Sequence, residues 1–381
     1  MISQPGKLRP LGDKRPNDNL TSAFSSLHID WPLLAALGIL MGIGLVILYS
    51  ASGQDWATLQ RQGVRLVVAW LVLIVVAQVA PRHLLFWTPW VYGIGLVLLL
   101  AVLLFGDVGK GAQRWLDLGL FRFQPSEMMK LAVPMMVAWY LSEKALPPSL
   151  ARIGVSLLII AAPALLIAKQ PDLGTAILVA SAGIFVLLLT GISWRLIGGF
   201  VALLAAAAPV VWFYLMRDYQ RQRVLTFLNP ESDPLGAGYH IIQSKIAIGS
   251  GGLYGKGWLN GTQSQLDFLP ERSTDFIFAV FAEEFGLIGI VALLAIYLAI
   301  VLRGLHIASL AQDSYTRLLA GSLTLTFLVY VFVNIGMVSG LLPVVGVPLP
   351  LVSYGGTSIV TLMAAFGILM SIQTHRKLLQ S

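Results

Sequence analysis

The chain has 381 residues, of which 57% are hydrophobic and only 11% are charged. Soluble domains carry about 25% charged residues, so this composition excludes an ordinary soluble protein and predicts a polytopic membrane protein. The net charge of +7 is modest, and the absence of cysteine excludes disulfides, thiolate nucleophiles and cysteine-ligated metal sites.

Residues 1–31 are polar and predict a cytoplasmic tail rather than a cleavable signal peptide. Ten apolar segments follow, each long enough to span or nearly span a bilayer. They lie near residues 32–50, 64–80, 84–105, 127–142, 152–168, 172–190, 196–215, 275–302, 318–338 and 357–373. The sequence therefore predicts an all-α membrane protein with ten transmembrane helices. One transmembrane domain would cover residues 32–374, and a second cytoplasmic tail residues 375–381.

The distribution of lysine and arginine predicts the orientation of these segments. With a cytoplasmic N-terminus, the inner connections hold more of these residues than the short outer loops. Both termini are therefore predicted inside, and the large loop of about 216–274, between the seventh and eighth helices, outside. The Pro- and Gly-rich segment 341–356 is predicted to be an irregular or re-entrant loop, which must be buried in protein or line a cavity.

Several arginines lie in outer loops, against that general distribution. Arg61, Arg114 and Arg122 lie in short loops, and Arg221 and Arg223 begin the large one. Arginines gathered on one face suit a phosphate or diphosphate, because a guanidinium can bind two oxygens at once. Alternatively, they contact lipid headgroups or form salt bridges between helices.

Ionisable groups also begin two of the apolar segments. Glu127 and Lys130 are three residues apart and share a helix face, so they can pair. They form either a structural ion pair or a site in which Lys130 also faces an anionic substrate. Asp172 begins the sixth segment, where an acid is favoured by the helix dipole and could act as a cap alone.

Asp275 stands where the large polar loop meets the eighth apolar segment. A carboxylate there can anchor a helix end or handle a proton on a lipid-borne substrate. Glu284 follows nine residues later, on the opposite side of a regular helix, so the two are not expected to form a catalytic pair. A structural role is favoured for Glu284.

The large loop contains two recognisable stretches. Residues 239–248 are amphipathic and predict a helix at the membrane surface. Residues 249–258 are glycine-rich but match neither the P-loop nor the dinucleotide-binding pattern, so they predict a turn rather than a nucleotide site.

Several motifs together resemble the SEDS (shape, elongation, division and sporulation) family across essentially the whole chain. They resemble the elongation branch more than the division branch. These motifs are Gly111–Asp117, Gln124–Glu127, Gln170–Thr175, Asn229–Pro234, Pro270–Phe278 and Pro343–Gly356.

The resemblance implies a ten-helix glycosyltransferase of the GT-C type in the bacterial cytoplasmic (inner) membrane. It would join lipid II units into glycan strands on the outer face, with a class B penicillin-binding protein as partner and no nucleic acid. The family's catalytic aspartate matches Asp275, which would act as general base on the acceptor 4-hydroxyl. Arg61, Arg114, Arg122 and Lys130 match positions suited to the diphosphate, Gln220 is a further substrate contact, and Glu127 and Asp172 are supporting residues.

Two points stay open beside that resemblance. A divalent cation (Mg or Mn) could bridge diphosphate oxygens, although the sequence shows no dedicated metal cage. Ser273 departs from relatives, which often have His before the Thr-Asp pair. A transporter or flippase of the same lipid would explain the outer arginines and the buried charges equally well, although it does not need a carboxylate at the cavity mouth. A scaffold that only positions the crosslinking enzyme is a third alternative.

Overall fold

The computed structural model describes residues 28–109, 112–117, 122–216, 218–233, 236–266, 268–269 and 271–375. Most of the predicted N-terminal tail, and all but His375 of the C-terminal one, lie outside these ranges. The helices are α2 (Trp31–Ala51), α3 (Trp56–Ala77), α4 (Pro81–Phe105), α5 (Pro125–Ser142), α6 (Leu150–Lys169), α7 (Leu173–Leu189), α8 (Trp194–Val210), α9 (Asp218–Leu228), α10 (Ala237–Ser250), α11 (Thr262–Gln265), α12 (Ile277–Ser309), α13 (Ser314–Val338) and α14 (Thr357–Thr374). The strands are β1 (Asp107–Gly109), β2 (Ala112–Asp117) and β3 (Arg122–Phe123); a π-helical turn, Val211–Leu215, continues α8, and a 3-10 turn, Pro230–Ser232, follows α9.

Each of the ten predicted apolar segments is a helix in this structure. Within the described residues, eight helices are long and apolar enough to cross a membrane. The other two predicted spans are α7, which has 17 residues, and α5, whose first turns carry Glu127 and Lys130. The coarse prediction, a helical membrane protein, is therefore confirmed.

Aspartates begin four of the long helices. Asp30 Oδ1 accepts from Leu33 N at 3.0 Å, Asp55 accepts from the amides of residues 57 and 58, Asp172 Oδ1 accepts from Thr175 N at 3.2 Å and Asp313 Oδ1 accepts from Thr316 N at 2.8 Å. Each side chain satisfies an amide that has no partner within its helix. Asp172 is therefore the helix cap that its position predicted.

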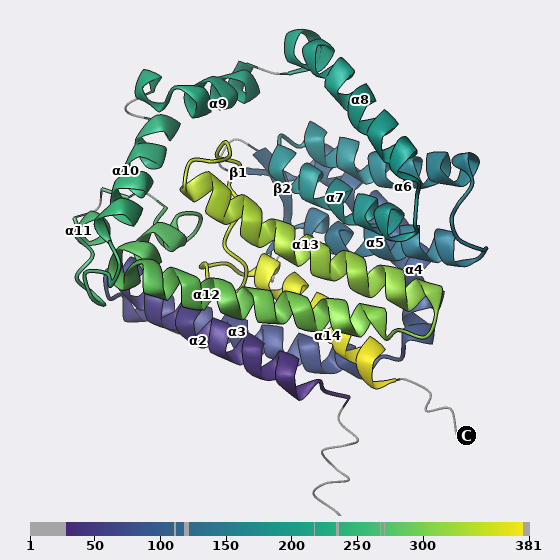
Figure 1. Ribbon diagram of the computed structural model, residues 1–381, viewed down its shortest axis with the longest axis horizontal. Helices are drawn as coiled ribbons and strands as arrows, with labels where there is room; N and C mark the ends of the chain where they lie inside the picture. Colours follow the sequence, from purple (N-terminus) through teal and green to yellow (C-terminus); the bar gives the residue numbers. More distant parts are fainter. Residues whose placement is uncertain are drawn as a thin grey trace, which may run out of the picture.

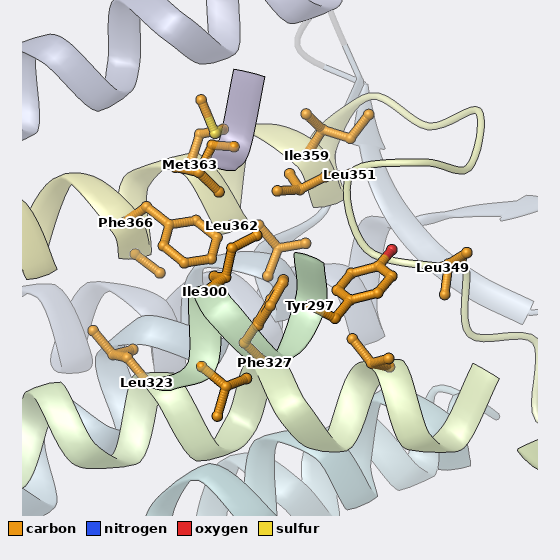
Figure 2. Close-up of a cluster of buried hydrophobic side chains, with 14 of the residues drawn as sticks. Tyr297, Ile300, Leu323, Phe327, Leu349, Leu351, Ile359, Leu362, Met363 and Phe366 are labelled. Atoms are coloured by element: carbon orange, nitrogen blue, oxygen red, sulfur yellow. The ribbon is translucent and has the colours of Figure 1, made fainter. Parts of the chain in front are cut away.

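The long helices pack as a bundle in which α12 and α13 run side by side (Figure 1). Close contacts also join α3 with α14, α6 with α7 and α4 with α5. Part of the core lies where α12, α13, α14 and the 341–356 loop meet, and Figure 2 shows a cluster of its side chains. The labelled residues are Tyr297, Ile300, Leu323, Phe327, Leu349, Leu351, Ile359, Leu362, Met363 and Phe366.

The irregular 341–356 loop is part of this core, as its composition predicted. Leu349 is 1% exposed and Val352 is also 1% exposed, and the loop contains neither helix nor strand. Its backbone approaches α2 so closely that a Cβ on Gly44 would lie 3.0 Å from Leu351 O. The loop therefore enters the bundle rather than lying on its surface.

The connection between α4 and α5 contains strands that the apolar pattern did not predict. β1 pairs with β2 and β2 with β3, both antiparallel, so that Asp117 stands opposite Arg122. Such short hairpins depend on turn geometry rather than on a long apolar period. The all-α prediction holds for the bundle, with this small sheet as an addition.

The segment predicted as the large loop, approximately residues 216–274, is partly helical. It contains α9, α10 and α11, and α10 (Ala237–Ser250) covers the helix predicted at 239–248. Figure 1 shows α8 and α9 arching away from the bundle, and α8 has no buried residue.

The connections fall at two ends of the bundle. Ser273 Oγ donates to Ala51 O at 3.2 Å, and Arg114 Nη2 donates to Pro171 O at 3.2 Å. The first contact joins the end of α2 with the start of α12, and the second joins the small sheet with the start of α7. The 341–356 loop links the two pairs, because a Cβ on Gly174 would lie 3.0 Å from Val345 O and one on Gly346 would lie 3.4 Å from Asp275 Oδ2. We call this end of the bundle the site end.

Candidate functional site

Asp275 lies in a turn that precedes α12, not in the helix itself. The amides of Thr274 and Phe276 both donate to Glu271 O, at 3.0 and 3.3 Å, and α12 begins at Ile277. The N-cap residue is Phe276, and the helix begins two residues after the start that the sequence predicted. The comparison of helical phase between Asp275 and Glu284 was therefore made on a wrong premise, because the two residues do not share one regular helix.

The 341–356 loop and α13 hold this turn in place. Ser353 Oγ donates to Thr274 O at 2.6 Å, and Tyr354 N donates to Ser273 O at 2.9 Å. Asn334 Nδ2 donates to Asp275 O at 2.9 Å and to Val347 O at 2.7 Å. The backbone on both sides of the half-buried Asp275 carboxylate is thus tied to the core.

Gly346 faces the Asp275 carboxylate directly. A Cβ at residue 346 would lie 3.4 Å from Asp275 Oδ2, and the residue has a φ of +74°. Glycine adopts such a backbone without strain. The loop therefore brings its backbone, and no side chain of residue 346, against the carboxylate.

Glu127 and Lys130 form the buried ion pair that their spacing predicted. Lys130 Nζ lies 2.5 Å from Glu127 Oε1, and both side chains are about nine-tenths buried. The ammonium also lies 5.1 Å from the centre of the Tyr330 ring, within the range of a cation–π contact.

A small cavity opens beside this pair, between α5, α13 and α14. Its volume is about 30 Å³, enough for one or two water molecules. Glu127 Oε2 and the Tyr330 hydroxyl are buried without a hydrogen-bond partner among the described residues, and both residues line the cavity. The charged pair therefore lies beside a small cavity whose lining is mostly apolar.

Arg114 and Asp172 form a second pair at the site end. Arg114 Nε lies 3.4 Å from Asp172 Oδ2, and the Asp172 side chain is 9% exposed. Since Asp172 also caps α7, the pair connects β2 with the start of that helix. Arg114 therefore has a structural partner already, as the alternative reading of the outer arginines allowed.

Arg61 lies on the first turns of α3 and is more exposed. It contacts Asp55 at 3.6 Å and Thr58 Oγ1 at 2.7 Å. The hydrogen bond from the Thr58 hydroxyl lowers the pKa of Asp55, so the carboxylate beside Arg61 is ionised. The guanidinium is thus partly neutralised within its own helix start.

The remaining predicted residues are Gln220 and Arg122. Gln220 is half-buried on α9, and Arg122 begins β3, where its backbone stands opposite Asp117. The side chain of Arg122 lies outside the described part of the structure, so its direction stays a prediction. The structure brings Arg114 to Asp172 and Lys130 to Glu127, but it places Arg61 beside Asp55 instead.

Sequence reasoning missed the residues that hold the Asp275 turn. Asn334 is a fully buried amide in an apolar helix, and a polar residue in such a segment is itself a signal of function or anchoring. Arg65 lies 4.4 Å over the Tyr354 ring, next to the amide that binds Ser273. Arg65 stands at the start of the predicted segment 64–80 and was not assigned to the site.

Among the described residues, no group of three or more His, Asp or Glu side chains could hold a metal ion. A divalent cation would therefore need ligands from outside this set, such as phosphate oxygens of a substrate.

Fold and site together define a helical membrane protein in which a polar turn before one helix presents a carboxylate. The chain belongs to the family of cell cycle proteins named for FtsW, RodA and SpoVE, whose sequence profile matches residues 25–378. The peptidoglycan glycosyltransferase MrdB of Escherichia coli (strain K12) is 59% identical over 363 residues, 95% of this chain and 98% of that protein. The peptidoglycan glycosyltransferase RodA of Treponema pallidum (strain Nichols) is 34% identical and covers 91% of this chain and 98% of its own.

Solved structures agree with this assignment. One chain, from a study of how a peptidoglycan synthase complex coordinates polymerization and crosslinking, superposes with a TM-score of 0.79 at 34% identity. It covers 90% of this chain and 97% of its own. The rod shape determining protein RodA of Thermus thermophilus superposes with a TM-score of 0.70 at 29% identity, over 91% and 98% of the two chains.

Proposed function

We propose that this chain is a peptidoglycan glycosyltransferase that polymerises lipid II during elongation of a bacterial cell. The observation that carries the proposal is the Asp275 turn. Three of its backbone carbonyls are bound by Asn334, Ser353 and Tyr354, so that a half-buried carboxylate is presented at the site end. Relatives with names of this activity cover nearly the whole chain.

Asp275 acts as the general base in this proposal. The acceptor sugar 4-hydroxyl gives its proton to the carboxylate as its oxygen attacks the anomeric carbon of the donor. A new C–O bond forms between the sugars, and the bond to undecaprenyl diphosphate breaks. A positioned base of this kind contributes about 10²–10⁴-fold to the rate.

Cationic side chains would stabilise the departing diphosphate. Lys130 is a buried cation that lines a small cavity. Arg114, Arg61 and Arg122 are the outer arginines assigned to the phosphates, with Gln220 as a sugar or phosphate contact. Glu127 and Asp172 would orient Lys130 and Arg114 through the pairs that they form. A bound Mg²⁺ or Mn²⁺ would supply further positive charge between phosphate oxygens.

Arg114→Ala tests the diphosphate assignment. We expect kcat/KM for lipid II to fall about 10–100-fold, because a hydrogen bond to a charged group contributes about 1.5–3 kcal/mol. Steady-state polymerisation of labelled lipid II measures it. Lys169→Ala, at the end of the helix that precedes Asp172, is the control and should change kcat/KM by no more than about twofold. Equal values for both variants would contradict a role of Arg114 at the phosphates.

The enzyme is further proposed to cross the bacterial inner membrane ten times. Residues 32–374 would form one transmembrane domain, with both tails in the cytoplasm and the site end outside. That orientation places the large loop, near residues 216–274, where a class B penicillin-binding protein could meet it. The support is that the predicted inner connections and tails hold more lysine and arginine than the short outer loops.

Because the natural chain has no cysteine, single cysteines report this topology cleanly. We expect a membrane-impermeant maleimide to label Tyr254→Cys in intact spheroplasts, since Tyr254 is 80% exposed in the large loop. Lys144→Cys, at the opposite end of the bundle, should react only after the membrane is opened. The reverse pattern would show that the orientation is wrong.

Purified chain with its crosslinking partner and labelled lipid II tests the activity directly. Formation of glycan strands supports the enzyme. Movement of lipid II across vesicles without strand formation would instead indicate a flippase, and partner binding without either activity would indicate a scaffold.

A further inference from the structure

The long helix α12 is interrupted at its tenth residue, Gly286, eleven residues after Asp275. Gly286 has φ 63° and ψ −164°, which is not helical. In a continuous helix the amides of Leu287 and Ile288 would bind the carbonyls of Glu283 and Glu284. Here they bind Gly252 O and Leu253 O instead, at 2.9 and 3.1 Å.

The glycine-rich turn of the large loop takes the place of the missing helical bonds. Lys256 N donates to Glu283 O at 3.0 Å, and Gly257 N donates to Glu284 O at 3.0 Å. Four backbone hydrogen bonds thus join the turn and the helix. We call residues 251–257 together with 283–288 the turn–helix junction.

Only glycine fits three positions of this junction. A Cβ on Gly251 would lie 2.2 Å from Ala282 O, and one on Gly255 would lie 2.1 Å from Glu284 O. A Cβ on Gly286 would lie 2.3 Å from Gly255 N. The glycines that the sequence suggested for a turn are therefore required by a close approach of two backbones.

Glu283 joins the same two segments through its side chain. It is fully buried, and its Oε1 accepts from Lys256 Nζ at 2.7 Å, Thr262 Oγ1 at 3.1 Å and Gln263 N at 3.0 Å. All three donors belong to the large loop. Burying a carboxylate costs several kcal/mol unless it is paired. The backbone of a continuous helix would need no buried carboxylate at residue 283, so the charge serves the contact with the large loop.

A short buried helical segment links the turn–helix junction to Asp275. Between them lies the first part of α12, residues 277–284, whose side chains are at most 5% exposed. At about 1.5 Å per residue this segment is only about 12 Å long. A shift at the junction therefore moves the segment as a unit and reaches the turn that carries the carboxylate.

Helix α10 contacts both ends of that segment. The His240 ring stacks on Phe276 with centroids 5.6 Å apart, and Ser250 Oγ lies 3.5 Å from Glu283 Oε1. Burial lowers the pKa of His240, so the ring on Phe276 is neutral near neutral pH. The large loop therefore contacts the first segment of α12 at both of its ends, next to Asp275 and near Gly286.

We propose that Glu283 is a positioning residue: by holding the large loop on α12 at the turn–helix junction, it sets where the Asp275 carboxylate stands relative to the acceptor hydroxyl. The inference rests on the proposed role of Asp275. A misplacement of about 1 Å in a reacting group can cost about 10²-fold in rate. Loss of the Glu283 contacts should consequently lower kcat rather than weaken substrate binding.

The first test compares two substitutions at one position. Glu283→Ala is expected to lower kcat about tenfold or more with KM for lipid II unchanged. Glu283→Gln retains an acceptor for Thr262 and Gln263 N and should recover most of kcat. Rates are compared well below the unfolding temperature of each variant. A wild-type kcat for Glu283→Ala, or an effect confined to KM, would overturn the proposal.

A reversible crosslink gives the second test, because Glu283→Ala could simply misfold. Lys256 N and Glu283 O are 3.0 Å apart, which brings the two Cα atoms within reach of a disulfide. In Lys256→Cys/Glu283→Cys, the only two thiols of the chain replace the ion pair. The oxidised protein should turn over several-fold faster than the reduced one, and reductant should reverse the gain. The two single-cysteine variants should not respond.

Equal rates for the oxidised and reduced double variant, with the bond verified by mass spectrometry, would overturn a positioning role. An inactive oxidised form would do so too, since it would show that the Glu283 carboxylate itself is needed. Asp275→Asn is measured in parallel. Full activity of that variant would refute Asp275 as base, whatever the redox response at the junction.

Discussion

Replacing Asp275 by asparagine is expected to lower glycan polymerisation by about 10²–10⁴-fold, the usual contribution of a positioned general base. Asparagine has the same size and leaves the turn intact, because the bonds that hold it use the backbone carbonyls of residues 273–275. The unfolding temperature and the binding of the crosslinking partner should therefore stay close to those of the natural protein. Gel analysis of labelled lipid II products measures the rate.

Glu271→Gln is the matched control for this prediction. Its carboxylate belongs to the same turn but is exposed, and exposed substitutions change stability by only about 0.5 kcal/mol. Its polymerisation rate should lie within about twofold of wild type. If Asp275→Asn polymerised as fast as this control, the proposed base would be wrong and another group would have to take the proton.

Lys130→Met is expected to destabilise the bundle strongly. It leaves the buried Glu127 carboxylate without the ammonium that lies 2.5 Å away, and breaking a buried pair on one side costs about 3–5 kcal/mol. Thermal unfolding in detergent measures the loss. The double variant Glu127→Gln/Lys130→Met removes both charges and should recover most of the stability.

Activity of that double variant separates the two readings of the pair. If Lys130 contacts the diphosphate, the double variant folds but polymerises slowly; recovery of both properties would make the pair structural only. Asp218→Asn is the control for stability, since Asp218 pairs with Arg221 at the same spacing but is fully exposed. It should change the unfolding free energy by less than about 1 kcal/mol.

The sequence predicted helices best where the apolar period was long. All ten segments are helices, with ends that agree to within a few residues except at α3, which begins at Trp56 rather than near 64, and α12, which continues to Ser309 rather than ending near 302. Polar residues near these ends, such as Gln62 and Arg303, interrupt the apolar pattern, so the sequence predicted these helices to be shorter than they are. Both are tied to other parts of the bundle, Gln62 by the Ser353 carbonyl and Arg303 by Asp30.

Pairs between residues close together in the chain could also be predicted, because helix geometry fixes their distance. Glu127 and Lys130 share a face because a helix brings residues three apart together, and Asp172 caps α7 because its first amides need an acceptor. The partner of Arg114 could not be predicted, because Asp172 is distant in sequence and the β hairpin that carries Arg114 follows no apolar period.

The class of protein, the positions of its helices and the candidate carboxylate could all be predicted from the amino-acid sequence. They depend on hydropathy and on interactions between residues close together in the chain. The contacts that hold Asp275 come from tertiary packing: Asn334, Ser353 and Gly346 contact its turn, and the junction at Gly286 ends the first segment of α12. The contacts of Asn334 and Ser353 join residues about 60 to 80 positions apart, and the junction pairs an interrupted helix with a turn. They form because buried backbone N–H and C=O groups need hydrogen-bond partners once the helices have packed.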